Sequence, residues 1–88
     1  MSIYSASILD PVAPVHLHRI DPGRNMARFY SLEVERDLFG RVVLVRRWGR
    51  LGTAGKTRLD EYLGEGEAMA TLEALQAAKR RKGYCPAS

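Results

Sequence analysis

Cysteine is nearly absent from this 88-residue sequence, which contains only Cys85. A single thiol excludes an internal disulfide, and it leaves no set of cysteines and histidines with the spacing of a zinc site. We therefore interpret Cys85 as an unpartnered thiol in the tail, and we expect neither a bound metal nor another cofactor. The sequence also lacks internal repeats and low-complexity segments, so a chain of this length predicts one small domain with one core.

Long apolar runs are missing as well. No run approaches the roughly 20 residues that a helix needs to span a bilayer. The N-terminal sequence MSIYSASILDPVAPV lacks the basic start and the long apolar middle of a signal peptide. With 45% apolar and 27% charged residues, the composition is that of an ordinary globular domain. We therefore expect a cytoplasmic protein with no membrane partner.

Acidic residues are absent from residues 41–58. This segment carries a charge of +6 and the rest of the chain sums to −2, because the net charge is +4. Its six cations are Arg41, Arg46, Arg47, Arg50, Lys56 and Arg58. Charge concentrated in this way favours a phosphate-bearing partner. A second cluster, KRRK at residues 79–82, falls at the end of a predicted helix, where cations complement the helix dipole, so we interpret it as structural.

Alternating apolar and polar residues predict an antiparallel sheet. The first three strands are VHLHRI, RFYSLEVER and RVVLVRRWG, separated by the turn sequences DPGRN and DLFG. In the third strand the period of two places Arg46 and Trp48 on one face and Arg47 on the other. After the glycine-rich sequence GRLGTAGK, TRLDEYL is predicted to return as a fourth strand, with Leu59 and Leu63 on one face.

The apolar period then changes to that of a helix. Apolar residues spaced by four, three and three predict an amphipathic helix from residue 65 to residue 82: Ala68, Leu72, Leu75 and Ala78. Gly83 is well placed to end this helix as the C′ residue. The fold class is therefore α+β, an antiparallel β-meander of about four strands covered on one face by a C-terminal amphipathic helix. Residues 1–14 are expected to form an arm, residues 15–84 the domain and residues 85–88 a tail.

The sequence GTAGKT is close to a phosphate-binding loop but does not meet the motif. The motif needs a glycine where this chain has Arg50, and it needs a helix after the loop, whereas TRLDEYL is predicted to be a strand. We therefore interpret Gly52 and Gly55 as turn residues. His16 and His18 share a strand face but lack a third ligand, so we interpret them as partly exposed strand residues rather than a metal site.

No nucleophile is spaced against a histidine and an acid, and no carboxylate pair lies in a recognisable loop, so we expect no enzyme. Trp48 has two interpretations. A lone tryptophan in a small domain is usually its largest buried group. However, this one lies at the end of its strand between arginines, and an aromatic ring flanked by guanidinium groups is suited to hold a sugar or base beside phosphates.

At these residues the chain resembles the WGR domain, which occurs beside the catalytic region of several poly(ADP-ribose) polymerases and as small stand-alone bacterial proteins. The resemblance runs from about Val15 to Tyr84 and rests on WGR at residues 48–50, LGTAGK, the strands RFYSLEV and VVLVRRWGR, and the ending GY. It implies an antiparallel sheet covered by a helix. It also implies that Trp48 packs on a nucleotide of DNA near a strand break and that Arg50 lies near the backbone. Lys56 stands where many relatives have glutamine, and it adds charge.

The resemblance does not extend to a transferase region, so it does not imply signalling of DNA breaks. We predict a small non-enzymatic nucleic-acid-binding module, for DNA rather than RNA, with little sequence specificity because few Asn or Gln side chains can contact base edges. The predicted contact residues are Trp48, Arg50, Arg47, Arg46, Lys56 and Arg58. The alternative is an interaction or regulatory subunit that uses the same basic patch on an acidic protein.

Overall fold

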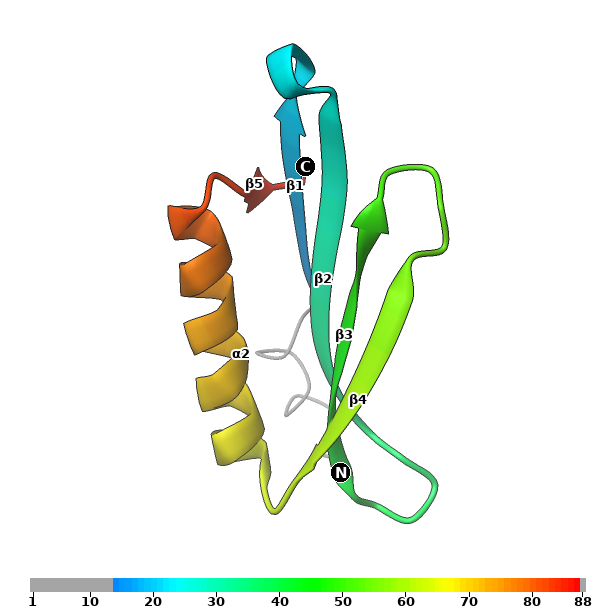
Figure 1. The fold of residues 1–88 in the computed structure, drawn as a ribbon. Coiled ribbons are helices and arrows are strands. Elements are labelled where there is room, and N and C mark those ends of the chain that lie inside the picture. Colours follow the sequence, from blue (N-terminus) through cyan, green and yellow to red (C-terminus); the bar gives the residue numbers. More distant parts are fainter. Residues whose placement is uncertain (1–13, 88) are drawn as a thin grey trace.

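The computed structural model describes residues 14–87, which form one antiparallel sheet and one long helix (Figure 1). The order of strands across the sheet is β4-β3-β2-β1-β5. The elements are β1 (Val15–Asp21), the 3-10 turn η3 (Pro22–Arg24), β2 (Met26–Arg36), β3 (Val42–Arg50), β4 (Lys56–Tyr62), α2 (Glu65–Arg81) and β5 (Cys85–Pro86). This arrangement confirms the predicted α+β class. Residues 1–13 of the predicted arm lie outside the described residues.

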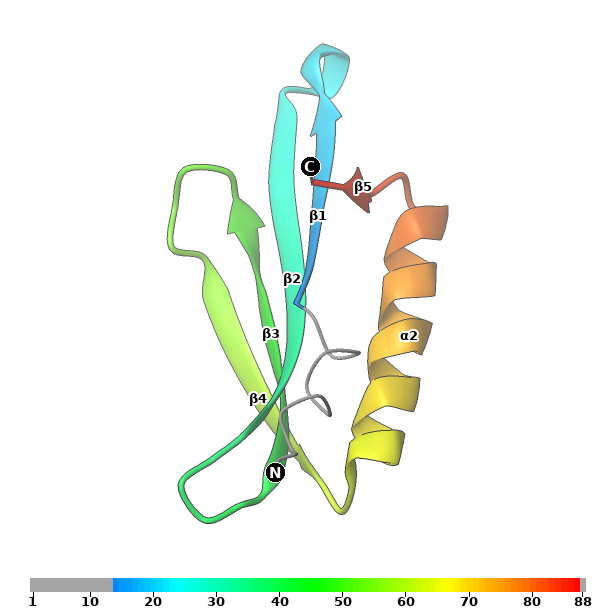
Figure 2. The same cartoon turned by 180° about the vertical axis from the view of Figure 1, so that it is seen from behind.

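The fifth strand, β5, was not predicted, because two residues that include a proline carry no alternating pattern. It pairs with β1 through Leu17 and His18, and the amide of Ala87 donates a hydrogen bond of 2.8 Å to the carbonyl of His16. This pairing attaches residues 85–87 to the edge of the sheet. It also leads the chain from the C-terminal end of α2 back to β1 (Figures 1 and 2).

The core lies between α2 and one face of the sheet, and the register of the strands decides which residues enter it. Leu17 of β1 stands opposite Tyr30 of β2, and Val34 of β2 opposite Leu44 of β3, so residues two apart along each strand meet the helix. The buried residues are Leu17, Tyr30, Leu32, Val34, Val42, Leu44, Ala68, Leu72 and Tyr84. Ala68 and Leu72 belong to the predicted helical stripe, and Leu75 is partly buried beside them.

The strand β4 contributes less to this core than its neighbours. Tyr62 is the β4 residue that packs against the core. Leu59 stands opposite Val45 on the sheet face away from α2, which we call the outer face, and Leu59 is 64% exposed. The strand ends at Tyr62, so Leu63 lies in the following turn and is 96% exposed. On the helix side, the other residues of β4 are polar: Lys56, Arg58 and Asp60.

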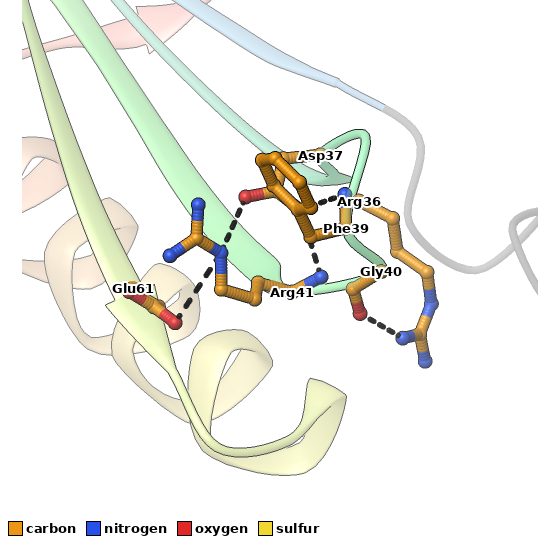
Figure 3. Close-up of polar contacts among 6 residues, drawn as sticks. All are labelled: Arg36, Asp37, Phe39, Gly40, Arg41 and Glu61. Atoms are coloured by element: carbon orange, nitrogen blue, oxygen red, sulfur yellow. Dashed lines mark hydrogen bonds and ion pairs between the residues drawn. The ribbon is translucent and has the colours of Figure 1, made fainter.

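The turn between β2 and β3 is held by Asp37 (Figure 3). Its Oδ1 accepts hydrogen bonds from the amides of Phe39 (2.8 Å) and Arg41 (2.9 Å), and its Oδ2 accepts one from Nε of Arg41 (2.8 Å). The bond from the Arg41 amide does most to hold the pKa of Asp37 below its ordinary value. The Nε atom of Arg41 also lies 3.7 Å from Oε2 of Glu61, so two nearby carboxylates compensate the charge of Arg41.

The end of α2 lies at the same end of the sheet as the end of β3 (Figure 1). Gly83 adopts φ +101 as the C′ residue, and the amide of Tyr84 donates to the carbonyl of Lys79. This closure buries Tyr84, whose ring meets Tyr30 edge-on with centroids 6.3 Å apart. The Lys79 ammonium lies 4.6 Å from the centre of the Tyr30 ring and 5.3 Å from that of Tyr84. The ammonium group of Lys79 is thus held beside the C-terminal end of β3.

Candidate nucleic-acid interface

Trp48 is both part of the fold and part of the surface. It lies on the helix side of β3, directly between Tyr30 of β2 and Lys56 of β4. It packs against the buried core yet remains partly exposed, because the helix ends beside it. Its ring is therefore held by packing on one side and accessible on the other, which combines the two interpretations that its position in the sequence left open.

Two cavities flank Trp48 on the helix side of the sheet. The first, of about 390 Å³, lies toward the middle of β3 and is lined by Tyr30, Arg46, Trp48, Arg58, Leu75, Ala78, Lys79 and Lys82. The second, of about 270 Å³, lies toward the end of β3 and is lined by Arg28, Phe29, Trp48, Gly49, Arg50, Lys79 and Tyr84. Trp48 and Lys79 line both cavities, and among residues 14–87 no carboxylate lines either.

Three arginines form a row across the sheet beside the second cavity. Arg19 of β1 stands opposite Arg28 of β2, which stands opposite Arg50 of β3. Like charges placed directly opposite on one face destabilise a sheet. Among residues 14–87 none of the three has a carboxylate within salt-bridge distance, and Arg50 makes only long hydrogen bonds to Asn25, of 3.4 and 3.5 Å. A bound anion would relieve this repulsion.

Beside the first cavity the charge is partly compensated. Arg46 stands opposite Arg58, and both bind Asp60: Nη2 of Arg46 lies 2.7 Å from Oδ2, and Nε of Arg58 lies 3.2 Å from Oδ1. The hydrogen bond from Arg46 holds the pKa of Asp60 below its ordinary value, and the same bond raises the pKa of Arg46. One carboxylate is thus shared by two guanidinium groups, so the three side chains together keep a net positive charge.

Lys79 completes the cluster from the helix. Its pKa is lowered chiefly by burial, and the positive charges of Lys82 and Arg28 lower it further. Burial and the two neighbouring cations both disfavour the charged form of this ammonium group, so a nearby anion would stabilise it. We call the helix-side surface around Trp48 the basic surface. Its cations are Arg19, Arg28, Arg46, Arg50, Lys56, Arg58, Lys79 and Lys82.

Five of the six predicted contact residues lie on the basic surface, and Arg47 does not. Because strand side chains alternate, Arg47 points to the outer face, between Ser31 and Thr57. The structure therefore does not bring Arg47 together with Trp48, although the two are adjacent in the sequence. Arg41, also in the basic segment, lies at the opposite end of β3 in its ion pairs with Asp37 and Glu61.

Sequence reasoning missed Arg19, Arg28, Lys79 and Lys82. For Arg28 the pattern offered a clue, since it lies two residues before Tyr30 and so shares its face. Lys79 and Lys82 were interpreted as helix-end cations, and nothing in their spacing shows that α2 ends over β3. Strand register and helix docking decide these positions.

Metal and membrane sites gain no support from the described residues. His16 and His18 lie on the outer face, and residues 14–87 contain no group of three metal-ligating side chains. No helix in the same part of the chain is both long and apolar enough to cross a membrane.

The comparisons with known proteins identify the family. Residues 13–88 match the WGR domain, which is a nucleic-acid-binding module in poly(ADP-ribose) polymerases. The chain is also 40% identical over 72 residues to the uncharacterized protein y4dW of Sinorhizobium fredii (strain NBRC 101917 / NGR234). That match covers 82% of this chain but 35% of the relative, so the chain spans about a third of that protein. No solved structure matches the chain. With the match covering nearly its whole length, the chain belongs to the WGR domain family.

Proposed function

We propose that this protein binds nucleic acid, DNA in particular, at the basic surface and acts as a binding module rather than an enzyme. The observation that carries the proposal is the position of Trp48 between two cavities that are lined by cations and, within the part of the chain that the structure describes, by no carboxylate. Nucleic-acid backbones place a sugar and a base between successive phosphates. A ring with cations on both sides matches that order of groups.

In this binding mode phosphates occupy the two cavities and the indole packs against the sugar or base between them. Arg28 and Arg50 donate to one phosphate, since guanidinium groups bind phosphate oxygens through paired hydrogen bonds. Lys79 lines both cavities and contributes to either contact. The preference for DNA rests on the sequence resemblance, which implies that Trp48 packs on a nucleotide of DNA.

This mode of binding DNA gives little sequence specificity. The chain has one asparagine and one glutamine, the residues best suited to read adenine edges. Asn25 already accepts hydrogen bonds from Arg50, and Gln76 lines neither cavity beside Trp48. Backbone contacts of this kind fix position without reading sequence.

The experiment that tests the proposal is the salt dependence of DNA binding. Fluorescence anisotropy of a labelled duplex, measured over a series of salt concentrations, should give a log-log slope of about −3 to −5. Each neutralised phosphate contributes about −0.9, and cations of the basic surface outside the two cavities would add further phosphate contacts, to a total of roughly three to six. A flat salt dependence would contradict the proposal. An acidic protein partner is distinguished by capture from lysate with and without nuclease, since only a protein partner survives nuclease treatment.

A further inference from the structure

The outer face carries a separate cavity, of about 350 Å³, on the side of the sheet opposite the basic surface. It lies over β2, with His16 and His18 of β1 on one side and the β3–β4 loop on the other. Phe29 and Ser31 of β2 form its floor, and Arg47 of β3 lines it as well. We call it the outer cavity. Its volume is at the lower end of the range of about 300 to 1,000 Å³ that small-molecule pockets occupy.

The loop wall of the outer cavity is fixed by two glycines of the sequence GRLGTAGK. A Cβ on Gly49 would lie 2.8 Å from the Cα of Gly55, and a Cβ on Gly55 would lie 2.7 Å from Cζ of Phe29. Gly55 also adopts φ +74. Only glycine at both positions therefore lets the loop lie against β3 and the Phe29 ring. Gly55, which belongs to the sequence that resembles a phosphate loop, thus allows the close approach that builds the cavity wall.

Hydrogen bonds hold the same loop in place. The amide of Leu51 donates to the carbonyl of Ala27 (2.9 Å), which extends the contact with β2 beyond the paired residues. The hydroxyl and the amide of Thr53 both donate to the carbonyl of Arg50, at 2.8 and 3.1 Å. The loop is thus a preformed wall, and preformed geometry reduces the ordering cost of binding.

The outer cavity is rich in hydrogen-bond donors. His16, His18, Ser31 and Arg47 each offer at least one N–H or O–H group, and no carboxylate from the described residues lines the cavity. Glu33 lies on the same face but one row further along β2, opposite Val45. Within residues 14–87 Arg47 makes no salt bridge, so its charge is available to a ligand.

Apolar side chains line the outer cavity as well. Phe29 on the floor and Leu51 and Ala54 of the loop supply a surface suited to a flat ring. Several donors beside an aromatic floor match a phosphate group attached to a ring system, since a phosphate presents three acceptor oxygens.

We infer that the outer cavity binds a small phosphate monoester that carries a flat ring, of the size of a nucleoside monophosphate. Arg47, Ser31 and the two histidines donate to the phosphate, and the ring lies on Phe29. This site lies on the opposite face from Trp48. It shares Phe29 with the second cavity and Tyr30 with the first, but none of the cations of the basic surface lines it, so it needs neither those cations nor a polymer.

The test is NMR titration of the imidazole resonances of His16 and His18 in the full chain, with adenosine 5′-monophosphate as the probe. We expect saturable shifts of both imidazoles, with adenosine and inorganic phosphate each binding at least about tenfold more weakly, because each lacks one half of the recognised group. Arg47→Gln should weaken probe binding by about tenfold or more, because a charge-assisted hydrogen bond is lost. Arg81→Gln, which removes the same charge from an exposed α2 position that lines none of the three cavities, should leave probe binding within about twofold.

Ser31→Ala provides a second variant of the cavity floor and should also weaken binding of the probe. The inference is overturned if the probe gives no saturable shift at millimolar concentration, or if Arg47→Gln and Arg81→Gln weaken it equally. It is equally overturned if only an oligonucleotide shifts the imidazoles, because the face would then bind a polymer. None of these outcomes affects DNA binding at the basic surface, which the salt dependence tests separately.

Discussion

At the scale of single residues, the balance of charge around Trp48 decides what the protein can bind. The basic surface holds eight cations, and two of them, Arg46 and Arg58, form ion pairs with Asp60 of β4. The residual positive charge lies beside an aromatic ring that the core holds in place. Substitutions of Trp48 and of Asp60 separate the contribution of the ring from that of the charge.

Replacement of Trp48 should reduce both the free energy of unfolding and the affinity for DNA, and an alanine should reduce them more than a phenylalanine. Trp48→Ala removes a partly buried ring, so we expect a loss of about 2 to 4 kcal/mol in the free energy of unfolding and of about 1 to 3 kcal/mol in DNA binding. Trp48→Phe keeps an aromatic face and should lose less of both. Urea unfolding and anisotropy titration measure the two effects. If Trp48→Ala lowers stability but leaves the affinity of the folded fraction unchanged, the ring has only a structural role.

Neutralising Asp60 should strengthen DNA binding while it weakens the fold. Asp60→Asn leaves the charges of Arg46 and Arg58 uncompensated, so affinity should rise and the salt slope should steepen by up to about 0.9. Glu61→Gln removes the same charge from the next residue, which faces the outer side, and should change affinity less. Equal effects of the two variants would show that only net charge matters, not the position of Asp60.

The ion pairs of Asp60 also predict how stability depends on pH. Its pKa lies below the ordinary value of 3.8 in the folded protein, so the folded state binds its proton less readily than the unfolded state does. The resulting stabilisation is present above pH ~4 and is lost as the pH falls through the depressed pKa. Urea unfolding in acid should therefore show a smaller fall in stability for Asp60→Asn than for the natural sequence. The fall should not vanish, because the pKa of Asp37 is also depressed.

At the scale of elements, the period of two in β3 separates neighbouring residues into two functions. Arg50 faces the basic surface and Arg47 faces the outer cavity, three residues apart on one strand. The sequence predicted this alternation, the turns and the helix correctly, because each depends on local periodicity and turn chemistry. It did not predict β5, and it did not place Arg28 and Lys79 beside Trp48, because pairing between distant segments sets those positions.

The alternation yields a matched pair of variants. Arg50→Ala and Arg47→Ala remove the same charge from the same strand but from opposite faces. Arg50→Ala should weaken DNA binding by about tenfold or more, as expected for a lost charge-assisted hydrogen bond, whereas Arg47→Ala should have a much smaller effect. Anisotropy titration at one salt concentration measures both. A similar loss for the two variants would show that the face of the sheet is irrelevant to binding.

The β3–β4 loop yields a second matched pair, this time for stability. Gly52 and Gly55 both adopt positive φ, of +91 and +74, so alanine at either position should cost about 1 to 2 kcal/mol in backbone strain. A Cβ on Gly52 would meet open space, whereas one on Gly55 would press on Phe29 and on the carbonyl of Trp48. Gly55→Ala should therefore cost about 1 to 3 kcal/mol more than Gly52→Ala. Equal losses in urea unfolding would contradict the close approach of the loop.

At the scale of the whole molecule, the fold gathers charge at one end. The basic surface combines residues from four strands and the end of α2, whereas Arg41 at the other end of β3 is neutralised in the turn that Asp37 holds (Figure 3). Composition and the charge of residues 41–58 indicated a basic patch, yet Arg41 and Arg47 belong elsewhere, and four cations from other segments join it. The family could be recognised from sequence, but the shape of the patch required the fold.

The most direct measurement of the central claim is the intrinsic fluorescence of Trp48 during titration with duplex, nicked and single-stranded DNA and with matched RNA, at two salt concentrations. Trp48 is the only tryptophan in the chain, so its emission reports on one site. We expect a saturable change in emission with the same midpoint as the anisotropy titration, and a weaker affinity at the higher salt concentration. Binding that is seen by anisotropy but leaves the emission of Trp48 unchanged would contradict the account.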